Sequence, residues 1–238
     1  MDKKLFRLGM KYHFAGILLF IGAAIGLLLS LLISLGDGEG ELHSMTTAMC
    51  GFATVIAAIL LTTELFAVAT AFNRSRGTLL KTLGVLFVLY SAFASALTLG
   101  LEFLLSKLFS HGDFDYQFRP MLQNFGVSHS ACTGFPGIIA GFVFQVLFFL
   151  MLALGGMFIF GLFRRLPPKL GLAAWILFIF GCNCFTLFGN EMAGLELDLG
   201  VSLRLGLYAC LLVLFGVGGS YCIKTCSAEP RSAVNANS

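Results

Sequence analysis

Charge is scarce in this sequence. Only 11% of its 238 residues are charged, whereas 58% are hydrophobic. Soluble domains carry about 25% charged residues, because a polar surface has to enclose the apolar core. The composition therefore excludes a soluble globular domain and predicts an integral membrane protein.

Motifs of catalysis are absent as well. The sequence contains no His-Glu-x-x-His, no Gly-x-Ser-x-Gly and no paired aspartates of the kind that intramembrane proteases use. The segment 218–225, GGSYCIKT, is the nearest approach to a nucleotide-binding loop. It fails because Ile223 precedes the lysine where a P-loop has glycine, and because a helix leads into it. We predict no enzyme activity, no catalytic residue and no cofactor held by this chain alone.

Cysteine and histidine form no recognisable site. Seven cysteines are scattered, mostly within apolar runs, so they predict packing rather than a disulfide framework. The pairs Cys182–Cys184 and Cys222–Cys226 have no histidine or carboxylate clustered around them. The segment 106–135 carries residue types that bind metals, at the spacing of no known site: His111, Asp113, Asp115, His129 and Cys132. We predict no metal site.

What the sequence does contain is a series of apolar runs. A bilayer core about 30 Å thick needs about 20 apolar residues for each helical crossing. Runs of that length recur between polar breaks, and the six are Phe14–Leu35, Met45–Thr70, Thr82–Leu105, Pro136–Phe163, Leu170–Phe188 and Leu203–Ile223. We predict an all-α integral membrane protein, with one transmembrane domain over 1–226, an outer loop at 106–135 and a flexible cytoplasmic tail at 227–238.

Lysine and arginine fall mostly on one side of this series of helices. With the N-terminus in the cytoplasm, twelve of the 15 basic residues lie on inner segments: Lys3, Lys4, Arg7, Lys11, Arg74, Arg76, Lys81, Arg164, Arg165, Lys169, Lys224 and Arg231. Positive charge marks cytoplasmic loops, so the pattern predicts six crossings with both termini in the cytoplasm. The cations form short juxtamembrane clusters that suit anionic lipid headgroups, so the net charge of +3 does not indicate nucleic acid as a partner.

Small residues recur at four-residue spacing in two of the predicted helices. They are Gly22, Gly26 and Ser30 in the first helix, and Gly137 and Gly141 in the fourth. Such stripes let helix backbones approach closely, which matters because lipid supplies no hydrophobic drive between helices. We predict that these glycines are helix-packing residues, either within one chain or between two copies.

Two glutamates lie inside apolar runs, where an ionised carboxylate is costly. Glu64 lies toward the cytoplasmic end of the second run, and Glu102 near the outer end of the third. Two interpretations are open. The glutamates serve a proton relay or contact a substrate, or they are interfacial, with Glu102 reaching the outer surface and the second helix ending near Glu64. The polar residues that we place inside the membrane, Gln145, Asn183 and Thr186, are few for an ion-coupled transporter.

The segment 64–80, ELFAVATAFNRSRGTLL, carries the most specific pattern in the sequence. Here the chain resembles the membrane subunits of ABC exporters of the ABC-2 type, in particular the small six-helix permeases common in Gram-positive bacteria. The residues that match in order and approximate spacing are Glu64, Asn73, Ser75 and Arg76. The sequence departs from the pattern at Arg74, where glycine is usual, and over 66–72, which is more apolar than in those permeases.

The resemblance implies a fold and a mechanism. The fold is an ABC-2 (type V exporter)-like bundle in the bacterial cytoplasmic membrane, in which the second crossing ends near residue 65. The segment 66–77 is then a cytoplasmic coupling segment that docks into a soluble ATPase, the subunit that supplies ATP and Mg²⁺. Two permease copies, identical or different, line one export pathway. The implied coupling residues are Glu64, Asn73, Arg74, Ser75 and Arg76.

Several questions stay open on the sequence. Glu64 anchors the coupling segment if it pairs with Lys81, Arg76 or an N-terminal lysine. A gradient-driven secondary transporter would instead have broken helices with polar groups near the midplane. A non-transporting membrane protein, such as an immunity or assembly factor, would work without an ATPase, and Arg74 and Arg76 would then be topology signals alone.

Overall fold

The computed structural model of the protein describes residues 3–11, 13–37, 46–109, 135–166, 173, 176 and 201–226. The helices in these residues are α1 (Lys3–Lys11), α2 (His13–Asp37), α3 (Thr46–Ala71), α4 (Arg76–Phe109), α6 (Phe135–Arg165) and α8 (Val201–Thr225). This described part of the chain contains no β-strand. Lipid cannot hydrogen-bond a peptide group, so long apolar runs form helices, which satisfy their own backbone.

Five of the described stretches are long and apolar enough to cross a membrane. They are Lys4–Ser30, Thr46–Ala71, Arg76–Leu104, Pro136–Arg165 and Tyr208–Thr225. These stretches overlap the first, second, third, fourth and sixth predicted crossings. The fifth predicted crossing, Leu170–Phe188, lies outside the described residues apart from Ala173 and Ile176, as do most of the loop 106–135 and the tail 227–238. The described chain is thus all-α, with five helices that can span a membrane.

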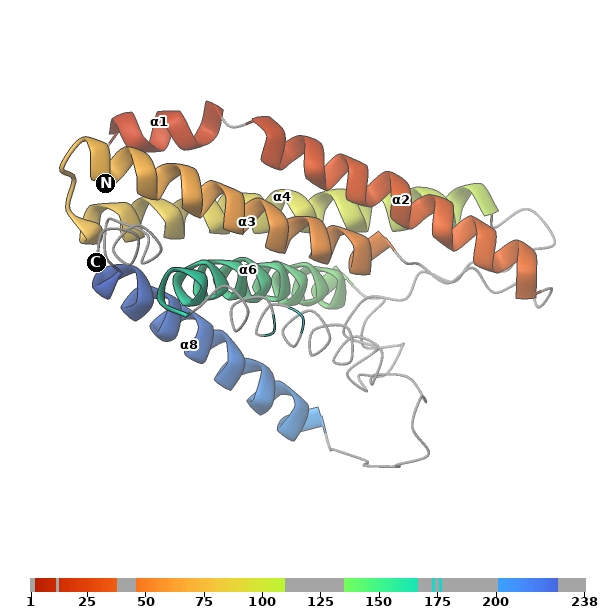
Figure 1. Ribbon diagram of the computed structural model, residues 1–238. Helices are drawn as coiled ribbons and strands as arrows, with labels where there is room; N and C mark the ends of the chain where they lie inside the picture. Colours follow the sequence, from red (N-terminus) through yellow and green to blue (C-terminus); the bar gives the residue numbers. More distant parts are fainter. Residues whose placement is uncertain are drawn as a thin grey trace.

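α6 lies at the centre of the described helices (Figure 1). It packs against α3 and α4 on one side and against α8 on the other, while α2 lies along α3. The short helix α1, the turn between α3 and α4, and the C-terminal ends of α6 and α8 all lie at one end of the bundle (Figure 1). We call this the basic end, because it carries Arg74, Arg76, Arg164 and Arg165.

Glycines of α6 allow close contact with both of its neighbours. A Cβ atom on Gly156 would lie 2.8 Å from the carbonyl oxygen of Val55 on α3. A Cβ atom on Gly161 would overlap the side chain of Cys222 on α8. At these crossings the helix backbones approach more closely than any larger residue on α6 permits, which maximises dispersion contact.

The predicted packing glycines lie in the interior. Gly22, Gly26, Gly137 and Gly141 are all buried. Gly22 of α2 touches α3, because a Cβ atom there would lie 2.9 Å from the carbonyl oxygen of Met49. The contact at Gly22 is between helices of one chain.

The helix boundaries around the predicted coupling segment differ from the expectation. We expect the second crossing to end near residue 65 and a separate element to follow over 66–77. In the structure α3 continues without a break to Ala71, and α4 begins at Arg76. The physical reason is composition, since 66–71 reads FAVATA and contains neither glycine nor proline to end a helix. The segment 66–77 is the end of one long helix, a turn and the start of the next.

The close approach of α3 and α6 predicts that Gly156→Ala destabilises the protein. The added methyl group meets backbone rather than a mobile side chain, and overpacking of this kind costs about 1–3 kcal/mol. Gly100→Ala on α4 is the matched control, because no atom lies within 4 Å of its Cβ position. Thermal unfolding in detergent should give a lower Tm for Gly156→Ala and an unchanged or higher Tm for Gly100→Ala. Equal Tm values would contradict the close contact.

Candidate functional site

The turn between α3 and α4 is built from backbone hydrogen bonds. The Asn73 amide donates to the Thr70 carbonyl at 3.1 Å, and the Arg74 amide donates to the Ala69 carbonyl at 2.8 Å. This pair of bonds is a Schellman motif, which satisfies the last carbonyls of a helix. Asn73 has φ of 50°, a left-handed conformation that asparagine tolerates better than most residues. The helix therefore ends at the asparagine of the predicted coupling pattern.

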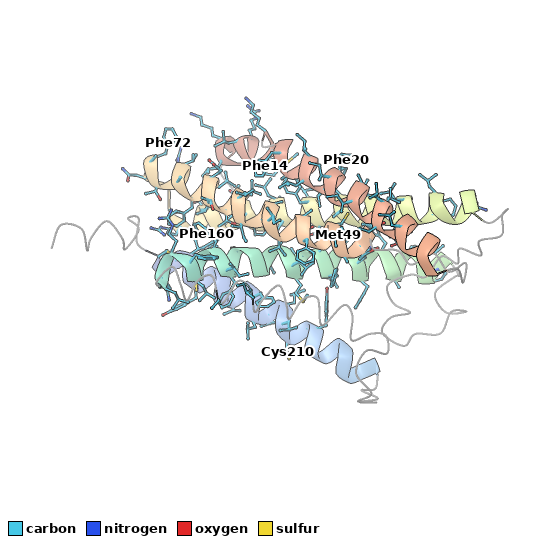
Figure 2. The ribbon with its side chains drawn as sticks, turned by 45° about the vertical axis from the view of Figure 1, so that its right-hand side comes forward. Phe14, Phe20, Met49, Phe72, Phe160 and Cys210 are labelled. Carbon is cyan, nitrogen blue, oxygen red and sulfur yellow. The ribbon has the colours of Figure 1, made fainter. Side chains whose placement is uncertain are left out.

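Ser75 starts the next helix at once. Its hydroxyl oxygen accepts a hydrogen bond from the Thr78 amide at 3.3 Å and shares a second one with the Thr78 hydroxyl at 2.8 Å. This is an N-cap, which satisfies an amide that the first turn of a helix leaves open. Phe72, Asn73, Arg74 and Ser75 are all exposed. Phe72, at 72%, is the most exposed large hydrophobic side chain in the described residues and projects from the tip of α3 (Figure 2).

Arg76 joins the base of this turn to the rest of the basic end. Its Nη1 donates to the carbonyl oxygen of Ile223 at 2.9 Å, in the last turn of α8. Its guanidinium carbon lies 4.5 Å from the centre of the Phe66 ring, and the guanidinium carbon of Arg164 lies 5.1 Å from the same ring. Each such cation–π contact contributes about 0.5–2 kcal/mol. Arg76 of α4 therefore contacts both α3 and α8, and Arg164 of α6 packs on the same Phe66 ring.

Cys226 follows α8 directly and lies among these arginines. Its side chain is buried. Burial raises the pKa of the Cys226 thiol, while the positive charges of Arg164, Arg165 and Arg76 oppose that rise. The net effect is a raised pKa, which favours the protonated thiol at neutral pH.

Glu64 does not join the turn. It lies on α3 seven residues before the helix ends, and its side chain is exposed. In the part of the chain that the structure describes, its carboxylate pairs with neither Lys81 nor Arg76, and Arg76 donates to the Ile223 carbonyl instead. The pairing of Glu64 with Lys81 or Arg76 is therefore not formed. Three of the five predicted coupling residues share the exposed turn, with Arg76 at its base and Glu64 about two helical turns away.

A second polar feature lies inside the bundle. Ser91, Ser95, Thr98 and Glu102 of α4 follow one another at intervals of four, three and four residues, which places them on one face of the helix. All four side chains are buried, Glu102 with only 6% exposure. We call these four residues the polar stripe.

Glu102 is enclosed by neighbouring side chains rather than exposed on the outer surface. The Thr47 hydroxyl of α3 donates a hydrogen bond to its Oε1 at 3.0 Å. One of our two interpretations, in which Glu102 reaches the outer surface, is therefore wrong. The reason is that this face of α4 is turned toward the start of α3 and not toward lipid.

Gln145 of α6 meets the stripe from the other side. Its side chain is 1% exposed, and its Nε2 donates to Thr98 Oγ1 at 2.7 Å. Its Oε1 has no hydrogen-bond partner, and neither do the hydroxyls of Ser91 and Ser95. A buried polar atom without a partner costs about 1–3 kcal/mol, so three of them along one interface require an explanation.

Three other buried hydroxyls in the bundle are satisfied within their own helix, whereas those of Thr46 and Tyr208 have no hydrogen-bond partner. Thr54, Thr62 and Thr82 each donate to the carbonyl oxygen four residues earlier, at 2.6–3.0 Å. This local bond makes a threonine or serine tolerable in an apolar helix. Thr98 of the stripe forms the same bond with the Ala94 carbonyl at 2.9 Å, whereas the Ser91 and Ser95 hydroxyls do not form it.

Sequence reasoning identified Glu102 and Gln145 but missed the three hydroxyl residues of the stripe. A single serine or threonine in a membrane helix carries little information, because the local bond usually satisfies it. The available signal was the spacing, since hydroxyl residues at helical intervals led up to an acid. Among the described residues, no three His, Cys, Asp or Glu side chains gather closely enough to hold a metal ion. The residues Asn183 and Thr186, and the loop residues His111, Asp113, Asp115, His129 and Cys132, lie outside the described residues.

A scan against protein-family models, a search of curated proteins and a search of solved structures each find no match to this chain. The functional argument therefore rests on the sites themselves.

The left-handed conformation of Asn73 predicts opposite results for two substitutions. Asn73→Ala should destabilise the protein, because a left-handed conformation costs an ordinary residue about 1–2 kcal/mol. Asn73→Gly should leave stability within a few tenths of a kcal/mol of the parent, or raise it, because glycine adopts this conformation without strain. Thermal unfolding of the two purified variants distinguishes them. If alanine were tolerated as well as glycine, the turn would not have the conformation described above.

Proposed function

We propose that this chain is the membrane-spanning permease subunit of an ABC exporter of the ABC-2 type, working as a dimer with separate ATPase subunits in the bacterial cytoplasmic membrane. The observation that carries the proposal is the exposed turn between α3 and α4. Its residues Asn73, Ser75 and Arg76 match the pattern of that family, and its base is bonded to a third helix.

The geometry of the turn suits an element that transmits a movement of a bound partner to the membrane helices. A Schellman motif closes α3 and an N-cap opens α4, so only the four residues 72–75 separate two long helices. Arg76 then connects this corner to α8 through the Ile223 carbonyl, and Phe66 connects it to Arg164 of α6. A partner that pushes on the turn would displace the ends of four helices together.

The surface of the turn suits a soluble protein partner. Phe72 offers an exposed aromatic ring and Arg74 an exposed cation, side by side in sequence. A cleft with an apolar floor and an acidic rim would accept both, in the manner of an interface anchor with a charged neighbour. The docking element is then a tight corner between two helices rather than a separate coupling helix.

A second candidate function is a gradient-driven transporter, and the polar stripe is the observation that favours it. A buried acid with polar neighbours inside a membrane helix is typical of proton and ion pathways. The requirement for an ATPase separates the two candidates.

The exporter proposal predicts that an ATPase co-purifies through the turn. We would purify the tagged, full-length protein from its native membranes in mild detergent, identify its partners by mass spectrometry and assay ATP hydrolysis. Phe72→Ser and Arg74→Glu should each reduce the recovered ATPase by about tenfold or more, which corresponds to about 1.4 kcal/mol of binding free energy. Arg76 is unsuitable for this test because it also holds the fold together.

Lys107→Glu is the matched control for Arg74→Glu. Lys107 is an exposed basic residue near the far end of α4, and its replacement changes the charge by the same amount. ATPase recovery should be unaffected by this change. A homogeneous parent protein that carries no ATPase would contradict the exporter proposal and leave the gradient-driven and non-transporting alternatives.

A further inference from the structure

We propose that the polar stripe and Gln145 form a hydrated proton-binding site that opens toward the end of the bundle opposite the basic end, with Glu102 as the proton acceptor. The proposal goes beyond the exporter function and requires no ATPase. Its ligands are water and the proton.

The position of the stripe along α4 gives it access to water from one side. Lys81 is the last exposed cation before the apolar part of α4 and marks one boundary of the membrane. At 1.5 Å per residue, Ser91 lies about 15 Å beyond Lys81 and Glu102 about 31 Å beyond it. Since the bilayer core is about 30 Å thick, Glu102 lies near the far boundary and Ser91 near the midplane. The stripe thus connects the far surface to the middle of the membrane.

The buried polar atoms without a hydrogen-bond partner indicate that water occupies the site. Gln145 Oε1 needs a donor, whereas the Ser91 and Ser95 hydroxyls need an acceptor for their hydrogens. Water supplies both, and buried waters typically bond to such otherwise unsatisfied groups. A metal ion would satisfy the oxygen atoms but would leave the hydroxyl hydrogens without an acceptor.

The face of the stripe becomes apolar one helical turn before Ser91, where Phe87 lies on it with 1% exposure. On the neighbouring faces of the inner half of α4, Leu79, Leu83 and Leu86 are buried as well. The one buried hydroxyl among them, on Thr82, donates to the Thr78 carbonyl. The polar path therefore stops at Ser91, so the site binds protons from one side without conducting them across.

Few titratable groups among the residues that the structure describes lie near Glu102 in the packed helices. The Cys50 thiol of α3 lies close enough to be affected by its charge. α6 contains no ionisable residue before Arg164, and α2 contains none between His13 and Asp37. In its first half α8 contributes Tyr208 and Cys210 among its described side chains, and α4 carries Tyr90. Lys107 follows on α4 itself. Glu102 is therefore the one buried carboxyl group among the described side chains of these helices.

The step itself is a simple acid–base exchange. Hydronium from the far side transfers a proton to the Glu102 carboxylate, which leaves a carboxylic acid and one water molecule. Release is the reverse, and no other bond forms or breaks. The Thr47 hydroxyl donates to the ionised form, so protonation alters a contact between α3 and α4.

Infrared spectroscopy of the full-length protein in lipid tests the site. The parent-minus-Glu102→Gln difference spectrum, recorded over about pH 5 to 9, should contain the carbonyl band of a carboxylic acid that appears on acidification. In Glu64→Gln, which removes the exposed glutamate of α3, the band assigned to Glu102 should be retained. A difference spectrum without a pH-dependent carboxylic-acid band would overturn the proposal.

A second measurement needs no change to Glu102. Transfer of the parent protein from water to heavy water should shift the carboxylic-acid band within the mixing time, because the site is hydrated. Gln145→Leu removes a water ligand without removing the acid and should slow this shift several-fold. A parent band that fails to shift would mean that Glu102 is dry, and the proposal would be wrong even if the exporter function were established.

Discussion

Close contact between helix backbones is the constraint on which the rest of this structure depends. In lipid the helices gain no hydrophobic free energy from association, so dispersion contact and hydrogen bonds have to hold them together. α6 carries most of that contact through Gly156 against α3 and Gly161 against α8. On either side of these glycines along α6, Gln145 bonds to Thr98 of α4 and Arg164 packs on the Phe66 ring of α3.

The two ends of the bundle solve the problem of polar groups in opposite ways. At the basic end, guanidinium groups pack on the rings of Phe66 and Phe160, and the negative faces of the rings attract these cations. The rings carry no net charge, so this end of the bundle remains positive. In the far half, polar groups are turned inward. Thr47 of α3 donates to Glu102 of α4, and Gln145 of α6 donates to Thr98 of α4. The first arrangement keeps charged groups at the surface of the bundle. The second places polar groups in its interior.

The sequence predicted best the features that depend only on the order and length of segments along the chain. Apolar run length depends only on bilayer thickness, so five predicted crossings correspond to helices in the described residues. The boundary near residue 65 was wrong because a helix ends where its caps are, at Asn73 and Ser75, and not where a charged residue such as Glu64 occurs. The burial of Glu102 could not be predicted from the sequence, because it depends on which face of α4 packs against α3 after folding. Whether the family resemblance identifies the function is a matter for the ATPase experiment.

The turn and the polar stripe belong to the same pair of helices, α3 and α4. Binding at the turn and protonation of Glu102 can therefore be coupled. α4 is 34 residues long, so the corner at its start and Glu102 near its end are connected by one continuous helix. The Thr47–Glu102 hydrogen bond and the 72–75 corner are the two ends of the contact between α3 and α4. If a partner at the corner favours one position of α4 against α3, it changes the proton affinity of Glu102, because binding free energies are reciprocal. By the same linkage, acidification on the far side changes the affinity of the corner for its partner. A rigid helix and a titratable contact at its far end are sufficient for this coupling, with no conformational pathway through the apolar core between them.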